Sequence, residues 1–348
     1  MTLPKIQQRP QDPPNAIQLE PVEGCSLACD FCGVQGIRES VGNYKFMNDE
    51  TVQHFISTLN EAMEGNNWNP RLELAMHGEP TMHPNIVAIC DDITNGVNPR
   101  ELIMVSNGTR FASHPALADE LAAAGVTSIC LDQYDGCDFV PKFVKDYKGG
   151  VPVYNFNDKK FRSLKHSGCY IVIKDDVTEL ESPYDKVNTH CGGGGKPWKN
   201  NPAIEKRCAK PFRELSIRWD GSVALCCNDF RGIYKIDSIL HHDNLDTLWQ
   251  HKNFDAARRV LYHNSREFDP CRWCDALSPR VGLLPDKFGK LQMPAPTPDT
   301  CHTLEVAVKG APLTVPVLRG WESEAACLPE HVKLVQLKTQ PIDEQGTQ

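Results

Sequence analysis

The chain has 348 residues, of which 40% are apolar, and a net charge of −8 at pH 7. This length accommodates one large domain or two of medium size, and the acidic balance argues against a generally basic nucleic-acid-binding protein. There is no run of about 18 apolar residues that would span a membrane, and the N-terminus lacks the apolar core of a signal peptide. We therefore expect a cytoplasmic protein whose fifteen cysteines serve as metal ligands or buried thiols rather than as disulfides.

Residues 1–15 are rich in Pro and Gln and predict a flexible N-terminus. From there to about residue 160, apolar segments of strand length alternate with helical patterns. Such alternation predicts βαβ units in a parallel sheet with right-handed crossovers, and ligands bind such sheets at the carboxyl ends of the strands. The expected strands are residues 16–22, 72–76, 102–105, 126–131, 151–156 and 170–174, and the expected helices are 49–63, 84–94 and 115–124.

Three cysteines lie within eight residues just after the first expected strand, at Cys25, Cys29 and Cys32. Three thiols are one short of a four-coordinate structural zinc site and of an iron–sulfur cluster held by four thiolates. A [4Fe-4S] cluster with only three thiolate ligands keeps one iron open for a substrate or cofactor. The alternative is three unrelated buried cysteines, because free Cys is among the most buried residue types.

The C-x3-C-x2-C spacing, with the aromatic Phe31 before the last cysteine, resembles the signature of the radical S-adenosylmethionine (radical SAM) enzymes. The resemblance implies that Cys25, Cys29 and Cys32 ligate a catalytic [4Fe-4S] cluster and that the backbone of Phe31 lies beside the adenine. In that family the open iron chelates the methionine part of SAM, and an electron from the cluster cleaves SAM to a 5'-deoxyadenosyl radical. An electron donor such as flavodoxin or ferredoxin is then expected as a partner.

The segment His77-Gly78-Glu79-Pro80 follows the second expected strand. A glycine there lets the backbone approach a ligand closely. The segment resembles the family's Gly-Gly-Glu-Pro, which receives the SAM amino group, with His77 in place of the first glycine. The resemblance therefore assigns Gly78, Glu79 and Pro80 to SAM binding.

Two further strand ends carry polar residues. Asn107, in a Ser-Asn-Gly segment after the third strand, is similar to the family residues that meet the SAM ribose or carboxylate. Ser, Asn and Gly are equally what any tight turn uses. After the next strand, Cys130 stands where relatives often have Ser, so its role is open, and Asp132 either contacts the substrate or caps the following turn.

A second set of cysteines follows at Cys208, Cys226, Cys271 and Cys274. Residues 215–225 predict a β-hairpin with Asp-Gly at its turn, which would bring Cys208 and Cys226 together. The adjacent Cys227 should point the other way along the strand and is left out of the ligand set.

This second set resembles the "twitch" module, a shortened relative of the SPASM domain, in which four such cysteines hold one auxiliary [4Fe-4S] cluster. A full SPASM domain continues with closely spaced cysteines for a second cluster. Here the next cysteine is Cys301, so we expect a single auxiliary cluster. A structural zinc site is the rival interpretation, because four cysteines with one C-x2-C pair also suit zinc.

The remaining cysteines and several other residues are expected to have structural roles. His241 and His242 are adjacent and should diverge, so they make no metal site. Arg258 and Arg259 are expected on a solvated helix face. Ordinary thiols are predicted at Cys90, Cys137, Cys169 and Cys191.

The resemblance covers about residues 16–275 and implies a partial (β/α)6 barrel followed by a small cluster-binding module of a β-hairpin and a helix. The C-terminal extension is Pro-rich, contains one strand-like alternation near residues 304–308, and is expected to pack weakly or to be partly disordered. The expected divisions are 1–15, a core over 16–175, a linker over 176–207, the module over 208–293, and the extension over 294–348.

We therefore expect a radical SAM oxidoreductase-type enzyme that abstracts hydrogen from an unactivated C–H bond. A fully ligated auxiliary cluster suits electron transfer, which favours a net oxidation such as a dehydrogenation or a crosslink. A small-molecule substrate is preferred to a peptide, because the chain offers no evident peptide-recognition domain; a peptide maturase is the alternative. A non-catalytic zinc-binding scaffold is the alternative of another class, and a nucleic-acid-modifying enzyme is disfavoured by the acidic charge.

Overall fold

The computed structural model describes residues 12–29, 32–134, 136–158, 161, 168–174, 208–262, 265–274 and 276, and the strands at 301–308, 311–318 and 332–338. Residues 1–11 of the expected N-terminal segment 1–15, and the whole of the expected linker 176–207, lie outside the described residues. Within the part that is described, none of the helices combines the length and the apolar character needed to cross a membrane.

Six parallel strands form the main part of a nine-stranded sheet. This arrangement confirms the parallel α/β architecture predicted from the alternating pattern, and the helices follow the strands along the chain. In spatial order the six strands are β1 (Ala16–Leu19), β4 (Arg71–Leu74), β5 (Leu102–Ser106), β6 (Ser128–Asp132), β8 (Tyr170–Lys174) and β7 (Val153–Asn155).

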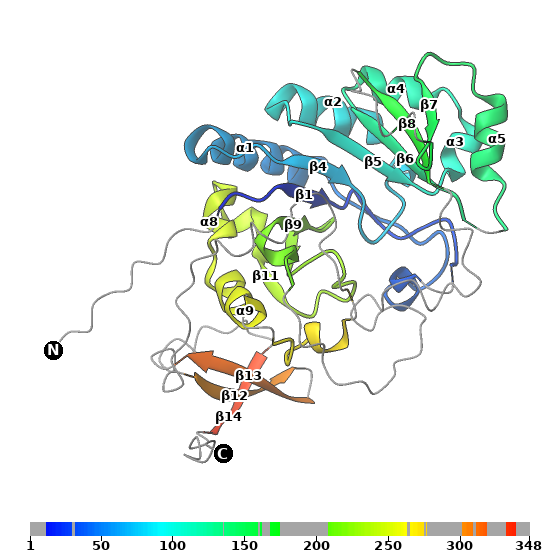
Figure 1. Ribbon diagram of the computed structural model, residues 1–348. Coiled ribbons are helices and arrows are strands. Elements are labelled where there is room, and N and C mark those ends of the chain that lie inside the picture. The colour runs from blue at the N-terminus through cyan, green and yellow to red at the C-terminus, as the bar shows by residue number, and fades with distance from the viewer. Residues whose placement is uncertain are drawn as a thin grey trace.

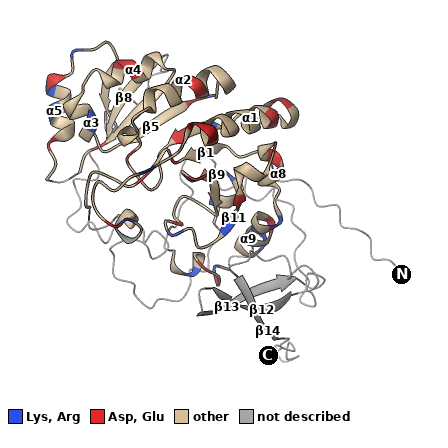
Figure 2. Ribbon diagram, turned by 180° about the vertical axis from the view of Figure 1, so that it is seen from behind, with Lys and Arg blue, Asp and Glu red and all other residues tan. Residues whose placement is uncertain are grey.

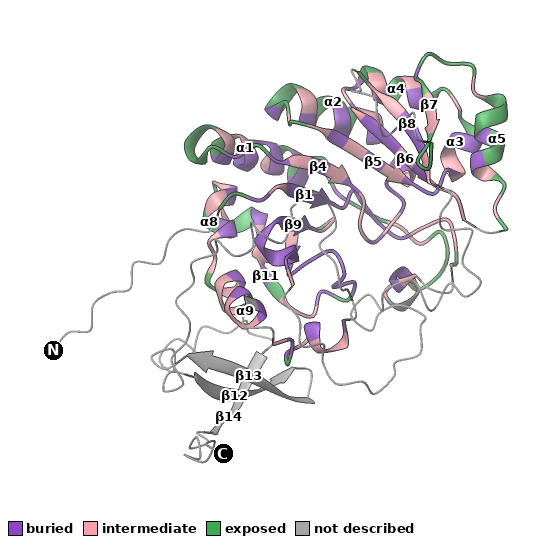
Figure 3. Cartoon of the chain, viewed as in Figure 1, coloured by how far each residue is buried: buried purple, intermediate pink, exposed green. Residues whose placement is uncertain are grey.

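Helices α1 (Asp49–Asn66) and α2 (Ile86–Val97) run alongside strands β4 and β5 (Figure 1). Asn48 caps α1, its side chain accepting a hydrogen bond from the Thr51 N–H at 2.8 Å. Figure 3 shows buried residues on the sides of both helices and along the central strands. Figure 2 shows acidic residues along α1. The remaining helices of this half are α3 (Thr109–Ser113), α4 (Leu117–Ala123) and α5 (Phe139–Asp146).

The second cysteine-bearing region continues the same sheet. Strand β9 (Glu214–Ile217) pairs in parallel with β1, and β10 (Ser222–Ala224) pairs antiparallel with β9. The predicted hairpin is thus confirmed, with Gly221 in its turn at a φ of 77°, a conformation that favours glycine. The region is completed by β11 (Lys235–Ser238), α8 (Leu245–Trp249), α9 (Lys252–Tyr262) and the short 3-10 helices η4 (Lys210–Phe212), η5 (Ile239–His241) and η6 (Cys271–Trp273).

Two small antiparallel sheets complete the described strands. The β2–β3 pair (Val22–Glu23 and Lys45–Phe46) flanks the first cysteine loop. The C-terminal extension holds three strands where the sequence pattern indicated one. These are β12 (Cys301–Val308), β13 (Ala311–Leu318) and β14 (Val332–Lys338), in the order β13-β12-β14.

The prediction that Arg258 faces solvent is wrong, because this side chain is buried. Its guanidinium lies 4.0 Å from the centre of the Trp249 ring. It donates to the carbonyl oxygens of Pro211 and Trp249, each at 2.7 Å. Burial lowers the pKa of Arg258 to about 9. Arg258 therefore ties α9 to the segment that follows Cys208.

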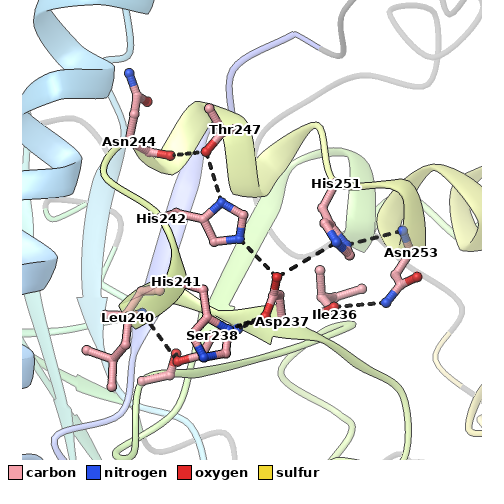
Figure 4. Close-up of polar contacts among 12 residues, drawn as sticks. Ile236, Asp237, Ser238, Leu240, His241, His242, Asn244, Thr247, His251 and Asn253 are labelled. Carbon is pink, nitrogen blue, oxygen red and sulfur yellow. Dashed lines mark hydrogen bonds and ion pairs between the residues drawn. The ribbon is translucent and has the colours of Figure 1, made fainter. Parts of the chain in front are cut away.

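Asp237 gathers three histidines where η5, α8 and α9 meet (Figure 4). His241 and His242 do not diverge as expected. His241 Nδ1 lies 2.7 Å from one carboxylate oxygen of Asp237, and His242 Nε2 lies 3.0 Å from the other. His251 Nε2 approaches the second oxygen at 3.8 Å. The two neighbouring rings converge because the backbone changes from 3-10 helix at His241 to extended at His242.

We predict that Asp237→Asn lowers the free energy of unfolding by about 1 kcal/mol, because the hydrogen bonds to the carboxylate are weakened. Burial raises the pKa of Asp237, but hydrogen bonds from His241, Ser238 and His242 outweigh it and hold the pKa below its usual range. The carboxylate is therefore charged at neutral pH. Urea unfolding of the anaerobic protein at pH 7 measures the change. Asp243→Asn, which removes the same charge from an exposed position nearby, serves as control, and an equal loss in both variants would contradict the prediction.

Candidate active site

The first cysteine loop begins at the carboxyl end of the β1–β2 segment and rests against the loop that follows β4. The Gly24 N–H donates to the His77 carbonyl at 3.2 Å, and the Glu79 N–H donates to the Gly24 carbonyl at 2.9 Å. A Cβ at Gly78 would collide with the carbonyl oxygens of Val22 and Gly24. The close approach of these two backbones therefore requires the glycine at position 78.

Asn107 joins the end of β5 to the cysteine loop. Its side-chain Nδ2 lies 3.3 Å from the Cys25 Sγ and 3.3 Å from the Ser26 hydroxyl. Its side-chain oxygen accepts from the Thr109 N–H at 2.9 Å, which sets the orientation of the amide. The resemblance predicted that Asn107 lies near the SAM ribose or carboxylate. In the structure its side chain lies beside Cys25, the first cysteine of the loop.

Glu79 is buried, and its carboxylate accepts several hydrogen bonds from the two neighbouring strand ends. The donors are the Asn107 N–H at 2.7 Å, the Ser106 hydroxyl at 2.8 Å, and the Thr81 hydroxyl and N–H at 2.5 and 3.1 Å. Burial raises the pKa of Glu79, and these hydrogen bonds oppose the rise. The side chain thus locks the loop after β4 to the loop after β5, while Pro80 begins the short helix η2 (Pro80–Met82).

The three thiols of the loop are close enough to influence one another. Burial raises the pKa of Cys29 to about 12, with the neighbouring Cys32 and Cys25 raising it further. The Cys32 N–H donates to the Cys29 carbonyl at 3.0 Å, and Arg38 donates to the Cys25 carbonyl at 2.8 Å, so the loop is folded back on itself. Neutral thiols of this kind become thiolates when a metal binds. Phe31 lies outside the described residues.

A second group of four thiols forms around the β9–β10 hairpin. Burial raises the pKa of Cys208 to about 12, and the nearby Cys226 and Cys274 raise it further. Burial also raises the pKa of Cys271, with contributions from the same three cysteines, while Arg266 opposes the rise. The hairpin and η6 therefore bring together the four cysteines that the sequence indicated.

Four neighbouring thiols match the usual ligand set of a four-iron cluster, and four cysteines with one C-x2-C pair also suit a structural zinc site.

Cys227 lies next to this group but has its own partners. The Lys210 ammonium donates to the Cys227 Sγ at 3.0 Å and to a Glu214 carboxylate oxygen at 3.1 Å. All three side chains are buried. Cys227 thus turns toward a buried ion pair, which agrees with its omission from the predicted ligand set.

Asp132 and Cys130 contact each other at the end of β6. The Cys130 Sγ lies 4.0 Å from an Asp132 carboxylate oxygen, and the Tyr134 hydroxyl lies 3.5 Å from the other oxygen. Burial raises the pKa of Tyr134 well above its ordinary value, and nearby negative groups add to the rise. Tyr134 is a residue of this strand end that the sequence pattern did not single out.

His77 is the other residue whose role the sequence did not reveal. Its side chain is fully buried, and its ring lies 4.2 Å from the Phe230 ring, centre to centre. Its Nε2 donates to the Cys227 carbonyl at 3.1 Å, and its Nδ1 lies 2.9 Å from a Glu20 carboxylate oxygen. The departure from the Gly-Gly-Glu-Pro pattern therefore places a side chain between the two groups of cysteines.

Known protein structures share this architecture. A crystal structure of BtrN in complex with AdoMet and 2-DOIA is 18% identical, matches 77% of this chain and 95% of its own, and has a TM-score of 0.58. BtrN in an open conformation is 14% identical, with 76% and 92% coverage and a TM-score of 0.51. At these identities the similarity establishes the fold.

Sequence comparison gives a shorter match to characterised proteins. GTP 3',8-cyclase from two strains of Haemophilus influenzae is 26% identical over 113 residues, which cover 32% of this chain and 31% of the cyclase. The alignment thus spans about a third of the length of these curated relatives.

Two family models match the two cysteine-bearing regions. Residues 19–153 match the radical SAM superfamily, and residues 208–275 match SPASM, described as an iron–sulfur cluster-binding domain. The first match contains the loop at Cys25, and the second contains all four downstream cysteines. The chain accordingly belongs to the radical SAM superfamily and carries a C-terminal SPASM domain, with a [4Fe-4S] cluster, S-adenosylmethionine and auxiliary iron–sulfur as its cofactors.

Proposed function

We propose that this radical SAM enzyme removes hydrogen from a small-molecule substrate in a net two-electron oxidation assisted by one auxiliary [4Fe-4S] cluster. When bound, the catalytic cluster and SAM supply a 5'-deoxyadenosyl radical. Held by Cys208, Cys226, Cys271 and Cys274, the auxiliary cluster would supply an acceptor for the second electron of the oxidation, and the accompanying proton would leave to solvent. The observation that carries the proposal is the convergence of Cys25, Asn107 and the Gly78–Glu79 backbone at neighbouring strand ends.

We propose that the cysteine loop holds the catalytic cluster and that the neighbouring strand ends hold SAM. Cys25, Cys29 and Cys32 ligate the catalytic cluster. The backbone of Gly78 and Pro80 borders the space for the SAM amino group, and Glu79 holds that backbone in place through its buried carboxylate. Further contacts to SAM are proposed for the Asn107 amide and the backbone of Phe31.

The auxiliary cluster is proposed on Cys208, Cys226, Cys271 and Cys274. Four protein thiolates leave no iron open, which suits electron uptake better than substrate binding. The next cysteine of the chain, Cys301, belongs to β12 of the separate three-stranded sheet, which supports one auxiliary cluster rather than two.

The fold comparison favours a small molecule as substrate. The fold matches 95% of the BtrN chain, which was crystallised with AdoMet and 2-DOIA. A peptide substrate is the alternative, and an electron donor such as flavodoxin or ferredoxin would reduce the catalytic cluster in either case.

The cluster assignment is tested by replacing Cys25, Cys29 and Cys32 together with alanine. Wild-type protein purified without oxygen should contain about eight irons, and the triple variant about four, because one four-iron cluster is lost. Only the wild type should convert SAM to 5'-deoxyadenosine. Iron and sulfide analysis with electron paramagnetic resonance (EPR) measures both results.

Cys169→Ala is the matched control, since this half-buried thiol lies outside both groups. It should keep about eight irons. A colourless wild-type protein that contains one zinc would overturn the proposal in favour of the scaffold interpretation.

Asn107→Ala should raise the dissociation constant for SAM about tenfold while leaving the iron content unchanged, because an amide at the site is lost but no ligand is. Anaerobic titration calorimetry measures the binding. Asn60→Ala, which removes an amide that donates to Glu64 on α1, should leave SAM affinity unchanged. An unaltered affinity in Asn107→Ala would remove this residue from the site.

The auxiliary cluster is tested by the double variant Cys271→Ala/Cys274→Ala. It should retain about four irons and still cleave SAM, but it should lose oxidation of the substrate because the electron acceptor is missing. Cys301→Ala should retain about eight irons. A fall in iron content in Cys301→Ala would argue for a second auxiliary cluster.

A further inference from the structure

His77 lies at a junction between the SAM-binding region and the SPASM region. Its side chain is fully buried between two groups that belong to different parts of the chain. On one side is the Glu20 carboxylate, which follows β1, and on the other is the carbonyl of Cys227, which follows β10. The family pattern has glycine at this position and provides no side chain for such a bridge.

The backbone of His77 holds both loops of the proposed SAM site. Its N–H donates to the Glu20 carboxylate at 3.1 Å, and its carbonyl accepts from the Gly24 N–H at 3.2 Å. Gly24 directly precedes Cys25, and Gly78 directly follows His77. A shift of His77 therefore moves the start of the cysteine loop and the Gly-Glu-Pro segment together.

The SPASM side of the junction is equally close to the proposed cluster ligands. Cys227 is the neighbour of Cys226 in the chain. Phe230, on which the His77 ring packs, also lies against the cysteine loop, since a Cβ on Gly33 would come within 2.7 Å of the Phe230 ring. Gly33 directly follows Cys32. The segment 226–230 thus contacts the end of the cysteine loop directly and its start through His77.

Buried charge holds this junction in a single arrangement. Glu20 is fully buried and also accepts from the Trp219 N–H at 3.2 Å, while the Arg218 guanidinium lies 3.7 Å away and pairs with Glu23. When a buried carboxylate loses one of its partners, the loss of folding free energy is several times the contribution of a surface ion pair. The arrangement around His77 is therefore well defined, and a change on one side is transmitted to the other.

We propose that His77 couples the two cofactor sites: the auxiliary cluster orders the Cys226–Phe230 segment, which positions His77 and, through it, the loops that bind SAM. His77 is a positioning residue in this scheme and touches neither substrate nor cluster. The proposal rests on the proposed function, because it assumes SAM at the Gly78–Glu79 loop and a cluster on Cys226. Such a coupling is reciprocal for the two binding equilibria.

A double-mutant cycle on SAM binding tests the coupling. The dissociation constant for SAM is measured without oxygen in four proteins: wild type, His77→Ala, Cys271→Ala/Cys274→Ala, and the variant with all three changes. His77→Ala alone and Cys271→Ala/Cys274→Ala alone should each raise the dissociation constant for SAM about tenfold. The combined variant should raise it by about the same factor, because both changes break one chain of contacts.

A combined loss of about a hundredfold would mean that the two changes act independently, and it would overturn the proposal. An unchanged affinity after removal of the auxiliary cluster would overturn it as well. Neither result contradicts the proposed function. The proposed function would be contradicted if the wild type lacked about eight irons or did not bind SAM. The two failures are therefore distinguishable.

Two further variants separate coupling from simple structural damage. His54→Ala removes a similar imidazole contact between α1 and the SPASM region, where the ring Nε2 lies 2.9 Å from the Ile239 carbonyl and 3.0 Å from that of His242. It should leave SAM affinity unchanged. His77→Gln retains a donor for the Cys227 carbonyl and should restore part of the affinity; if His77→Ala does not fold, the same cycle is run with His77→Gln. A glutamine variant with additive losses would contradict the coupling.

Discussion

Strand β1 is hydrogen-bonded along both of its edges, and the placement of the two groups of cysteines depends on this pairing. β4 lies along one edge and β9 along the other, both parallel and in register over all four residues of β1. Parallel strands end at the same edge of a sheet, so the segments that leave β1 and β4 begin beside each other and beside the hairpin that leaves β9. A continuous sheet, rather than a linker, therefore sets the separation of the two sites. In the proposed function, this fixed separation would hold the auxiliary cluster at a constant distance from a substrate bound at the first site.

Two buried carboxylates organise the strand ends above this sheet. Glu20 follows β1 and accepts hydrogen bonds from the loop after β4 and from the hairpin. Glu79 accepts hydrogen bonds from residues at the end of β5. Each carboxylate is satisfied by several donors, which is what makes its burial tolerable. Carboxylates that accept several hydrogen bonds from different segments in this way favour one arrangement of the loops. The backbone near Cys25 is thereby held by contacts within the protein.

Local patterns in the sequence predicted the elements well, because they are governed by short-range physics. The strand at residues 170–174 and the turn at Asp220–Gly221 were predicted where they occur, and the helix predicted over 49–63 extends to Asn66, where Asn67 takes a left-handed conformation. The cysteine spacings identified both groups of thiols for the same reason.

Long-range partners were not predictable in this way. The β1–β9 pair joins segments about two hundred residues apart, and no residue pattern in either strand indicates which strand it pairs with. Arg258 looked like a surface residue because the sequence does not show that Trp249 lies over its guanidinium. His77 looked like a minor departure from a motif, although its ring fills a space between distant segments. Each of these depends on tertiary packing that overrides a local preference.

The pairing of β1 on both edges has a consequence for synthesis of the protein on the ribosome. Residues 16–174 emerge first and can form the parallel strands, but the second edge of β1 then has no partner until residues 214–217 have been translated. An unpaired edge is a template for pairing with another chain, and domains generally fold in order of synthesis. The nascent chain thus passes through a stage in which its central strand is exposed to aggregation. Expression of the N-terminal half alone would make that stage permanent.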